Sequence, residues 1–139
     1  MNQIYRVTLI SSISILFCTS IFAQPYGWVV LNSGTNNNLH GVSFTSQNIG
    51  TVVGLSSTIL RTTNGGTNWV SQVSPGPLAH LFDVYFYNDN TGWIVGDIGK
   101  IMKTTNGGTN WVLETSGTAY QLQSIAAVDQ NTLYAAGWY

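Results

Sequence analysis

The sequence predicts an all-β fold built from a repeated unit of about 42 residues, each unit contributing four short strands. Residues 39–69 and 81–111 align without a gap at a shift of 42 positions, with 16 identities in 31 positions. Within that alignment, eight consecutive residues, 62–69, recur unchanged as 104–111. Apolar and aromatic residues occur in short runs separated by Gly, Asn, Thr and Ser, and no long amphipathic helical pattern is present.

The first two strands of each unit are predicted from their apolar residues. The first carries Leu39, Val42 and Phe44 in one unit, and the same three positions recur 42 residues later. The second contains a run of β-branched and aromatic residues and ends at a glycine, Gly54 or Gly96.

The last two strands of each unit flank the eight-residue block. The third strand is expected over residues 58–63 and 100–105, which are rich in β-branched and apolar residues. An Asn-Gly-Gly turn follows, because asparagine and glycine tolerate positive φ angles. The fourth strand then opens at Trp69 or Trp111, whose large rings are expected to pack in the seam between units.

Partial units flank the two full repeats, 39–74 and 81–116. Residues 28–35 match 111–118, which predicts the last strand of an earlier unit, and a truncated third repeat starts at Leu122. Four strands in about 42 residues is the size of a propeller blade, so residues 24–139 predict a partial β-propeller of about 2.8 blades. Closed propellers use 4 to 8 blades, and we therefore expect a fragment of a longer propeller, with closure by several short chains as the alternative.

Residues 1–23 are predicted to be a signal peptide. A cation, Arg6, precedes an apolar run from Val7 to Phe22, and Ala23 offers a small residue for cleavage. The run is shorter than the ~20 residues of a bilayer-spanning helix, so no integral membrane span is expected after cleavage. The protein is therefore expected to be exported, secreted or held at the cell surface, with the periplasm or thylakoid lumen as alternatives.

The composition argues against several classes of function. Charged residues make up 6% of the chain, and only Arg61, Lys100 and Lys103 carry positive charge after residue 23. Nucleic acid is not an expected partner, because its phosphates need clustered cations. No metal or cofactor is expected either, since His40 and His80 lack cysteine or glutamate at ligand spacing and the aspartates do not form an EF-hand loop.

The repeated block resembles the Asp-box, or bacterial neuraminidase repeat, whose pattern is Ser or Thr, any residue, Asp, any residue, Gly, any two residues, then Trp. Asparagine stands in place of aspartate in both copies. The phrase Gly-Trp-x-Val-Gly, Gly-x-Ile, Thr-Thr-Asn-Gly-Gly-x-x-Trp, present nearly unchanged in residues 92–111, is similar to the photosystem II stability and assembly factor-like propellers. The motif positions are Thr62, Asn64, Gly66, Trp69, Thr104, Asn106, Gly108 and Trp111.

The resemblance implies a non-catalytic, exported propeller that binds a protein as a scaffold or assembly factor, with a role in photosystem II assembly or stability. A cell-surface glycan-binding or adhesion module is the alternative hypothesis. A sialidase-like hydrolase is a third, and it is disfavoured because Arg61 is the one arginine after residue 23 to hold a substrate carboxylate. No catalytic residue is assigned.

Four residues are candidates for partner or ligand binding. Arg61 and Lys103 share one repeat position, just before the paired threonines, and could form part of a ring of cations; a solvated strand position is the simpler interpretation. Tyr85 and Tyr87 could stack on sugars or anchor a protein partner, because exposed rings combine an apolar face with a polar group.

Overall fold

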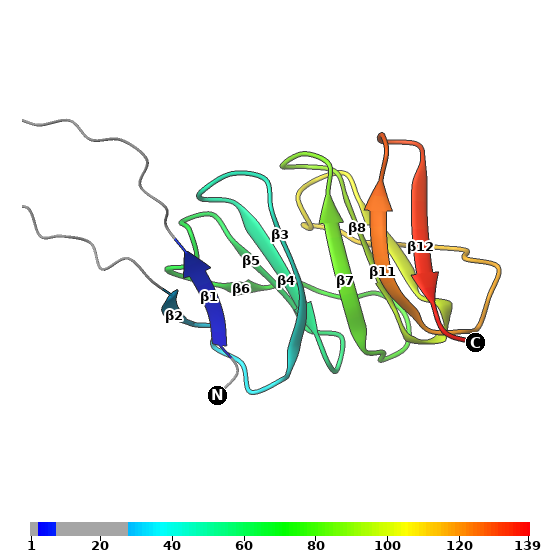
Figure 1. The fold of residues 1–139 in the computed structure, drawn as a ribbon, viewed down its shortest axis with the longest axis horizontal. Coiled ribbons are helices and arrows are strands. Elements are labelled where there is room, and N and C mark those ends of the chain that lie inside the picture. The colour runs from blue at the N-terminus through cyan, green and yellow to red at the C-terminus, as the bar shows by residue number, and fades with distance from the viewer. Residues whose placement is uncertain (1–2, 8–27) are drawn as a thin grey trace, which may run out of the picture.

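The computed structural model describes residues 3–7 and 28–139 (Figure 1). These residues form an all-β structure with one 3-10 turn and no α-helix. The strands are β1 (Gln3–Val7), β2 (Trp28–Asn32), β3 (Leu39–Phe44), β4 (Gly50–Gly54), β5 (Ile59–Thr62), β6 (Val70–Ser71), β7 (Leu81–Phe86), β8 (Gly92–Gly96), β9 (Ile101–Thr104), β10 (Val112–Glu114), β11 (Leu122–Ala127) and β12 (Leu133–Gly137); the 3-10 turn η1 is Asp97–Gly99.

The strands form four antiparallel sheets that follow one another along the molecule (Figure 1). Two complete blades have the orders β3-β4-β5-β6 and β7-β8-β9-β10, and two-stranded sheets, β1-β2 and β11-β12, flank them. The first strands β3, β7 and β11 lie side by side. Each of these first strands carries a register irregularity near its start, at Leu39/Gly41, Leu81/Asp83 and Leu122/Ser124. The predicted repeat of four-stranded units is confirmed.

The sequence range predicted as a signal peptide lies largely outside the described residues. Within it, residues 3–7 form β1, which pairs antiparallel with β2, so that Ile4 lies opposite Leu31. Residues 28–32 form the strand expected from the match to 111–118, although this strand is the edge of a two-stranded sheet in the described structure.

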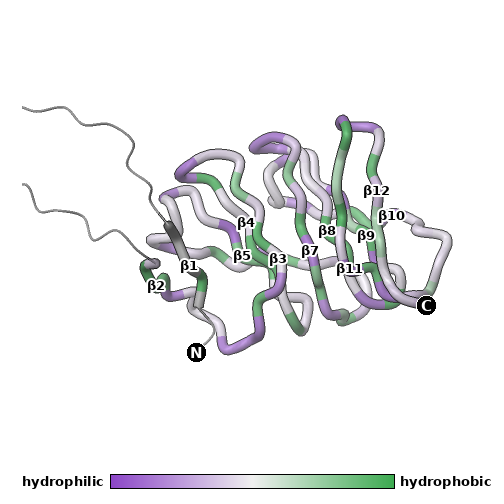
Figure 2. The backbone as a smooth tube through the Cα atoms, in the orientation of Figure 1, coloured by the Kyte–Doolittle hydropathy of each residue, from purple (hydrophilic) through white to green (hydrophobic). Residues whose placement is uncertain are grey.

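Two apolar clusters hold the sheets together. The first joins the two complete blades and contains Val53, Ile59, Leu81, Val84, Phe86, Ile94, Met102 and Trp111. The second joins β7–β10 to β11–β12 and centres on Trp93, Val95 and Ile125. Successive residues of β8 alternate between the two clusters because side chains of a strand point to opposite faces of the sheet. A strand buried on both faces needs residues without exposed polar groups, and all five residues of β8, Gly-Trp-Ile-Val-Gly, are buried. In Figure 2 much of the hydrophilic colour lies in the loops at the ends of the sheets.

The loops lie at two opposite ends of the sheets. One end, which we call the Asp-box face, combines the first-to-second-strand loops with the Asp-box turns: Gly65 N donates to Asn48 O, and Gly107 N donates to Asn90 O, both at 2.9 Å. The other end, the connection face, combines the second-to-third-strand turns with the segments that join one blade to the next. There Asp97 N donates to His80 O at 2.9 Å.

A glycine ends the second strand of every blade because a backbone carbonyl passes over it on the connection face. A Cβ atom on Gly54 would lie 2.1 Å from Asn38 O, one on Gly96 2.3 Å from His80 O, and one on Gly137 1.8 Å from Gln121 O. These distances are shorter than any Cβ contact, so the connecting segment can cross at this point only above a glycine.

Candidate functional site

The first Asp-box turn is held by a network within residues 62–69. Thr62 Oγ1 accepts hydrogen bonds from the backbone N–H of Gly66 at 2.9 Å and of Asn64 at 3.3 Å, and it donates to Asn64 Oδ1 at 3.0 Å. Asn64 Oδ1 also accepts from the N–H of Asn68 at 2.9 Å. Thr67 Oγ1 closes the turn by donating to Asn64 O at 3.0 Å.

The second copy has the same network at nearly the same distances. Thr104 Oγ1 accepts from Gly108 N at 2.8 Å, and Asn106 Oδ1 accepts from Asn110 N at 2.9 Å. In both copies the asparagine oxygen acts as an acceptor, and the amide nitrogen takes part in none of these bonds. A carboxylate oxygen accepts equally well, which explains how asparagine can replace the aspartate of the motif.

The two motif tryptophans differ in how the preceding blade contacts them. Trp111 is buried, packs edge-to-face against Phe86 with ring centroids 5.9 Å apart, and donates from Nε1 to Gln72 Oε1 at 3.2 Å. Trp69 packs in the same way on Phe44 at 6.2 Å, but its buried Nε1 has no hydrogen-bond partner among the described residues. Leu31 occupies the position over the first turn that Gln72 occupies over the second.

Arg61 and Lys103 lie against aromatic rings rather than pointing freely into solvent. Arg61 is half-buried: its guanidinium lies 4.8 Å from the centroid of Phe86 in the next blade and donates to Asp89 O at 2.6 Å and to Thr51 Oγ1 at 2.9 Å. Burial lowers the pKa of Arg61, and the Asp89 carboxylate acts in the opposite direction. Lys103 Nζ lies 5.2 Å from the ring of Trp93. A role for either cation in ligand binding remains a prediction.

Tyr85 and Tyr87 lie in different surroundings. Tyr85 stands opposite Trp93 in the β7–β8 pair and packs against the second apolar cluster. Tyr87, which follows β7 on the Asp-box face, is exposed. Tyr87 therefore presents a free ring surface, whereas Tyr85 is packed against apolar neighbours.

The Asp-box face carries a cleft of about 740 Å³ between the two Asp-box turns. Arg61 lies at this cleft together with Asp89, and the rest of the lining is dominated by amides and hydroxyls, among them Asn64, Asn68 and Asn106. Most residues that line this cleft are polar, and its lining contains one cation and one anion.

The connection face carries a second cleft of about 670 Å³ beside the 3-10 turn η1. Its lining includes exposed apolar and aromatic side chains: Leu78, Ile98, Tyr120, Trp138 and Tyr139. Tyr120 and Tyr139 pack edge-to-face with centroids 6.3 Å apart, and Trp138 Nε1 donates to Gln123 Oε1 at 2.6 Å. We call this set of five residues the aromatic rim.

Sequence reasoning did not group the residues of the aromatic rim or select its neighbour Lys100 as a site residue, although Trp138 and Tyr139 are among the aromatic residues that the sequence offers for partner binding. Rim residues come from three separate loops and one strand end, so no spacing in the sequence groups them. The structure itself marks this region: Ile98 has φ +53°, a conformation that β-branched residues avoid, and such strain collects at functional sites. His80 and Asp97 line the same cleft. Among the described residues, no three His, Cys, Asp or Glu side chains gather as metal ligands would.

These features define an Asp-box β-propeller: the blades are antiparallel, the motif tryptophans lie in the seams between them, and the Thr-Asn-Gly turns are held by hydrogen bonds. A sequence model of the family described as Photosynthesis system II assembly factor YCF48 matches residues 22–113. The chain belongs to this family. No curated protein sequence matches the chain.

Two solved structures are similar in fold. One, described as "YCF48 bound to D1 peptide", has a TM-score of 0.72 and 24% identity, with 85% of this chain and 40% of that chain covered. YCF48 from Cyanidioschyzon merolae has a TM-score of 0.68 and 16% identity, with 79% of this chain and 38% of that chain covered. This chain thus corresponds to about two fifths of each structure's length. In the part of the chain that the structure describes, no helix has the length and apolar character of a membrane span.

Proposed function

We propose that this chain is part of an exported, non-catalytic β-propeller that binds another protein as an assembly factor, with a role in photosystem II assembly or stability. The family match carries this proposal. A similar structure, described as bound to a D1 peptide, supports a protein as the partner.

The aromatic rim is the part of the described surface best suited to a peptide. Large rings and aliphatic side chains bordering a cleft supply the apolar anchors that dominate protein recognition. His80, Asp97 and Gln121 add polar groups to the same cleft, which can orient a peptide backbone. The Asp-box turns, in contrast, use their side chains to hold their own backbone.

A direct binding measurement tests the proposal. The full chain is titrated against a fluorescently labelled D1 peptide, with a peptide of the same composition in scrambled order as the control. We expect saturable binding of the D1 peptide alone. Trp138→Ala should weaken it about tenfold, whereas Val128→Ala, an exposed apolar side chain outside the rim, should leave it unchanged. Equal binding of both peptides, or of neither, would overturn the photosystem role.

Glycan binding is a second candidate because the same rings could stack on sugar faces. Tyr120, Trp138 and Tyr139 are each more than half exposed. A glycan array distinguishes the two functions: Trp138-dependent glycan binding without D1 peptide binding would favour an adhesion module.

A further inference from the structure

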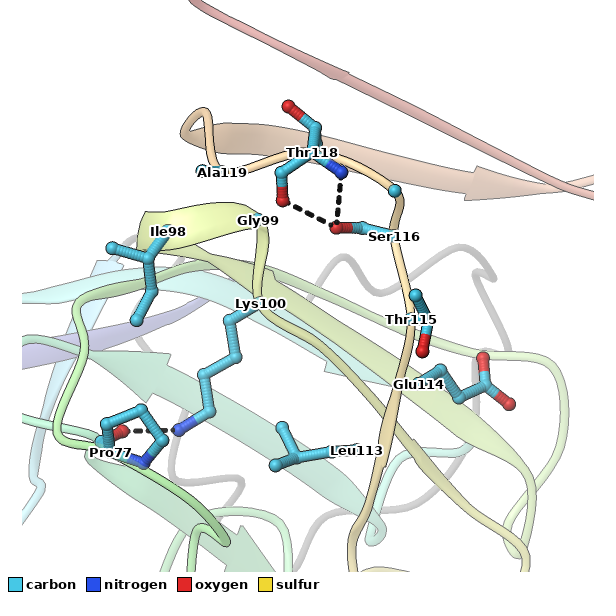
Figure 3. A pocket seen from close by; sticks show the side chains of 11 residues that line it. Pro77, Ile98, Gly99, Lys100, Leu113, Glu114, Thr115, Ser116, Thr118 and Ala119 are labelled. Atoms are coloured by element: carbon cyan, nitrogen blue, oxygen red, sulfur yellow. Dashed lines mark hydrogen bonds between the residues drawn. The ribbon is translucent and has the colours of Figure 1, made fainter.

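Lys100 is a buried cation beside a pocket on the connection face. It lies between η1 and β9, and its side chain is 5% exposed. Its ammonium donates to Pro77 O at 2.9 Å and to Ser74 Oγ at 3.1 Å, both in the segment that joins the first complete blade to the second. Figure 3 shows the side chain running between Pro77 and Leu113.

The charge of Lys100 has no counter-charge in the described structure. Both acceptors are neutral, and among residues 3–7 and 28–139 no carboxylate lies within ion-pair distance of Nζ. Glu114 lines the same pocket, but its carboxylate points away from the ammonium (Figure 3). An ammonium withdrawn from water without an opposite charge is disfavoured, and this desolvation lowers the pKa of Lys100.

The equivalent position in the first complete blade is neutral and fully satisfied within the protein. Thr58 occupies it, donates from Oγ1 to Leu55 O at 2.6 Å and accepts from Asn37 Nδ2 at 2.8 Å. Asn37 comes from the segment that enters the first blade, just as Ser74 and Pro77 come from the segment that enters the second. A lysine is therefore not needed to hold this kind of connection in place.

The pocket beside Lys100 has room for a small group. Its volume is about 430 Å³, and Leu113 and Ile98 give it aliphatic sides while Thr115, Ser116 and Thr118 contribute hydroxyls. Its wall is well defined, because Gly99, at φ +66°, lies so close to Thr118 O that a Cβ would be 2.0 Å away. An ammonium has three N–H donors, and the protein uses two of them.

We infer that this pocket binds a single carboxylate group, which completes the hydrogen bonding of the Lys100 ammonium and supplies its missing counter-charge. The carboxylate belongs to a free aliphatic acid or to a peptide, as an acidic side chain or a chain terminus. The inference does not depend on the proposed function, because a free acid alone can test it.

The test measures the reactivity of Lys100 in the full chain. Competitive labelling of amines with acetic anhydride over a pH series, read by mass spectrometry, gives the pKa of each lysine. The probes are isobutyrate, an acetylated tetrapeptide with a free C-terminal carboxylate, its C-terminal amide, and an amidated peptide with one internal glutamate. A bound carboxylate stabilises the ammonium, so we expect the pKa of Lys100 to rise and its labelling at a fixed pH to slow at least tenfold.

Lys103 is the internal control, because it lies on β9, three residues after Lys100, but outside this pocket. Protection by isobutyrate as well as the peptides would assign the pocket to free acids, and protection by the carboxylate peptides alone would assign it to a partner chain. The inference would be overturned if no carboxylate probe changed the labelling of Lys100. It would also be overturned if Lys103 were protected as much as Lys100, or if the neutral amide protected Lys100 as much as the carboxylate peptides did. This readout uses the native chain and so does not require a Lys100 variant to fold.

The D1 peptide titration fails or succeeds separately. If isobutyrate protects Lys100 but the D1 peptide does not bind, the proposed function is wrong and the carboxylate site stands. If the D1 peptide binds through the aromatic rim but no probe protects Lys100, the carboxylate site is wrong and the proposed function stands.

Discussion

Gln72 holds the Asp-box turn of the next blade through Trp111. Its Oε1 accepts from Trp111 Nε1 at 3.2 Å, and its Nε2 donates to Gly107 O at 3.1 Å. One side chain that follows β6 therefore satisfies a buried donor and a turn carbonyl of the neighbouring sheet. The seam between blades is thus joined by directional bonds as well as by apolar packing.

Replacing Gln72 by leucine should destabilise the seam. Gln72→Leu leaves Trp111 Nε1 buried without an acceptor, which costs about 1–3 kcal/mol. Urea unfolding followed by tryptophan fluorescence should show a lower midpoint. Gln47→Leu, at an exposed loop position, is the matched control and should leave the midpoint unchanged. Equal midpoints for the two variants would show that the Gln72 bonds contribute nothing.

The opposite substitution at the preceding seam should stabilise the fold. Leu31 lies against Gly66 as Gln72 lies against Gly108, and Trp69 Nε1 is buried without a partner among the described residues. Leu31→Gln supplies an acceptor, so we expect a gain of about 1 kcal/mol in the free energy of unfolding. The urea midpoint measures it. Leu31→Met keeps the side chain apolar and should give no gain; a fall in stability for Leu31→Gln would contradict the equivalence of the two seams.

The Asp-box turn requires a hydrogen-bond acceptor at Asn106 but does not require a charge there. Asn106→Asp keeps the oxygen that accepts from Asn110 N and Thr104 Oγ1, and its stability should stay within about 0.5 kcal/mol of the parent. Asn106→Ala removes both bonds and should cost about 1–2 kcal/mol. Asn110→Ala, which keeps the backbone donor, is the control. Thermal unfolding compares the three, and equal melting of Asn106→Ala and the parent would rule this role out.

Asp83 joins the last two sheets through the backbone. Its Oδ2 accepts from Ile125 N at 2.9 Å and from Ser124 Oγ at 3.0 Å. Hydrogen bonds to a charged group contribute about 1.5–3 kcal/mol, so in Asp83→Ala the Ile125 amide should exchange with deuterium at least tenfold faster. The Ile94 amide within β8 serves as the internal control. Unchanged protection of Ile125 would mean that packing alone holds β11 in place.

Stability should depend on pH in the alkaline range because of Lys100. Burial lowers its pKa in the folded state, so between that pKa and the ordinary value of about 10.4 the unfolded chain binds more protons. Stability from this group therefore rises with pH across that window. Urea midpoints from pH 7 to 10.5 should show a shallower rise in Lys100→Met than in the parent, whereas Lys103→Met should follow the parent. Parallel curves of urea midpoint against pH for all three proteins would contradict a lowered pKa of Lys100.

Local sequence was sufficient to predict the blade strands. The predicted strand positions at 39–44 and 81–86 agree with β3 and β7, and the Asn-Gly-Gly turns lie where expected. The third strands are one residue shorter at each end than predicted, 59–62 and 101–104. Thr62 and Thr104 are the last residues of these strands, paired with Gly50 and Gly92, and their hydroxyls accept hydrogen bonds from the Asp-box turn that follows.

The sequence by itself determined the repeat, the family and the turn chemistry, because these depend on residues close together in the chain. Only the tertiary structure decided which motif tryptophan has a hydrogen-bond acceptor and that the aromatic rim gathers on one face. It also decided that Lys100 is buried with no counter-charge among the residues that the structure describes. Gln72 and Trp111 are 39 positions apart, and Lys100 is 26 positions from Ser74. Contacts between residues so far apart in the chain follow from how one blade packs on the next. The repeat also places different chemistry at equivalent positions: Leu31 corresponds to Gln72, and Thr58 corresponds to Lys100.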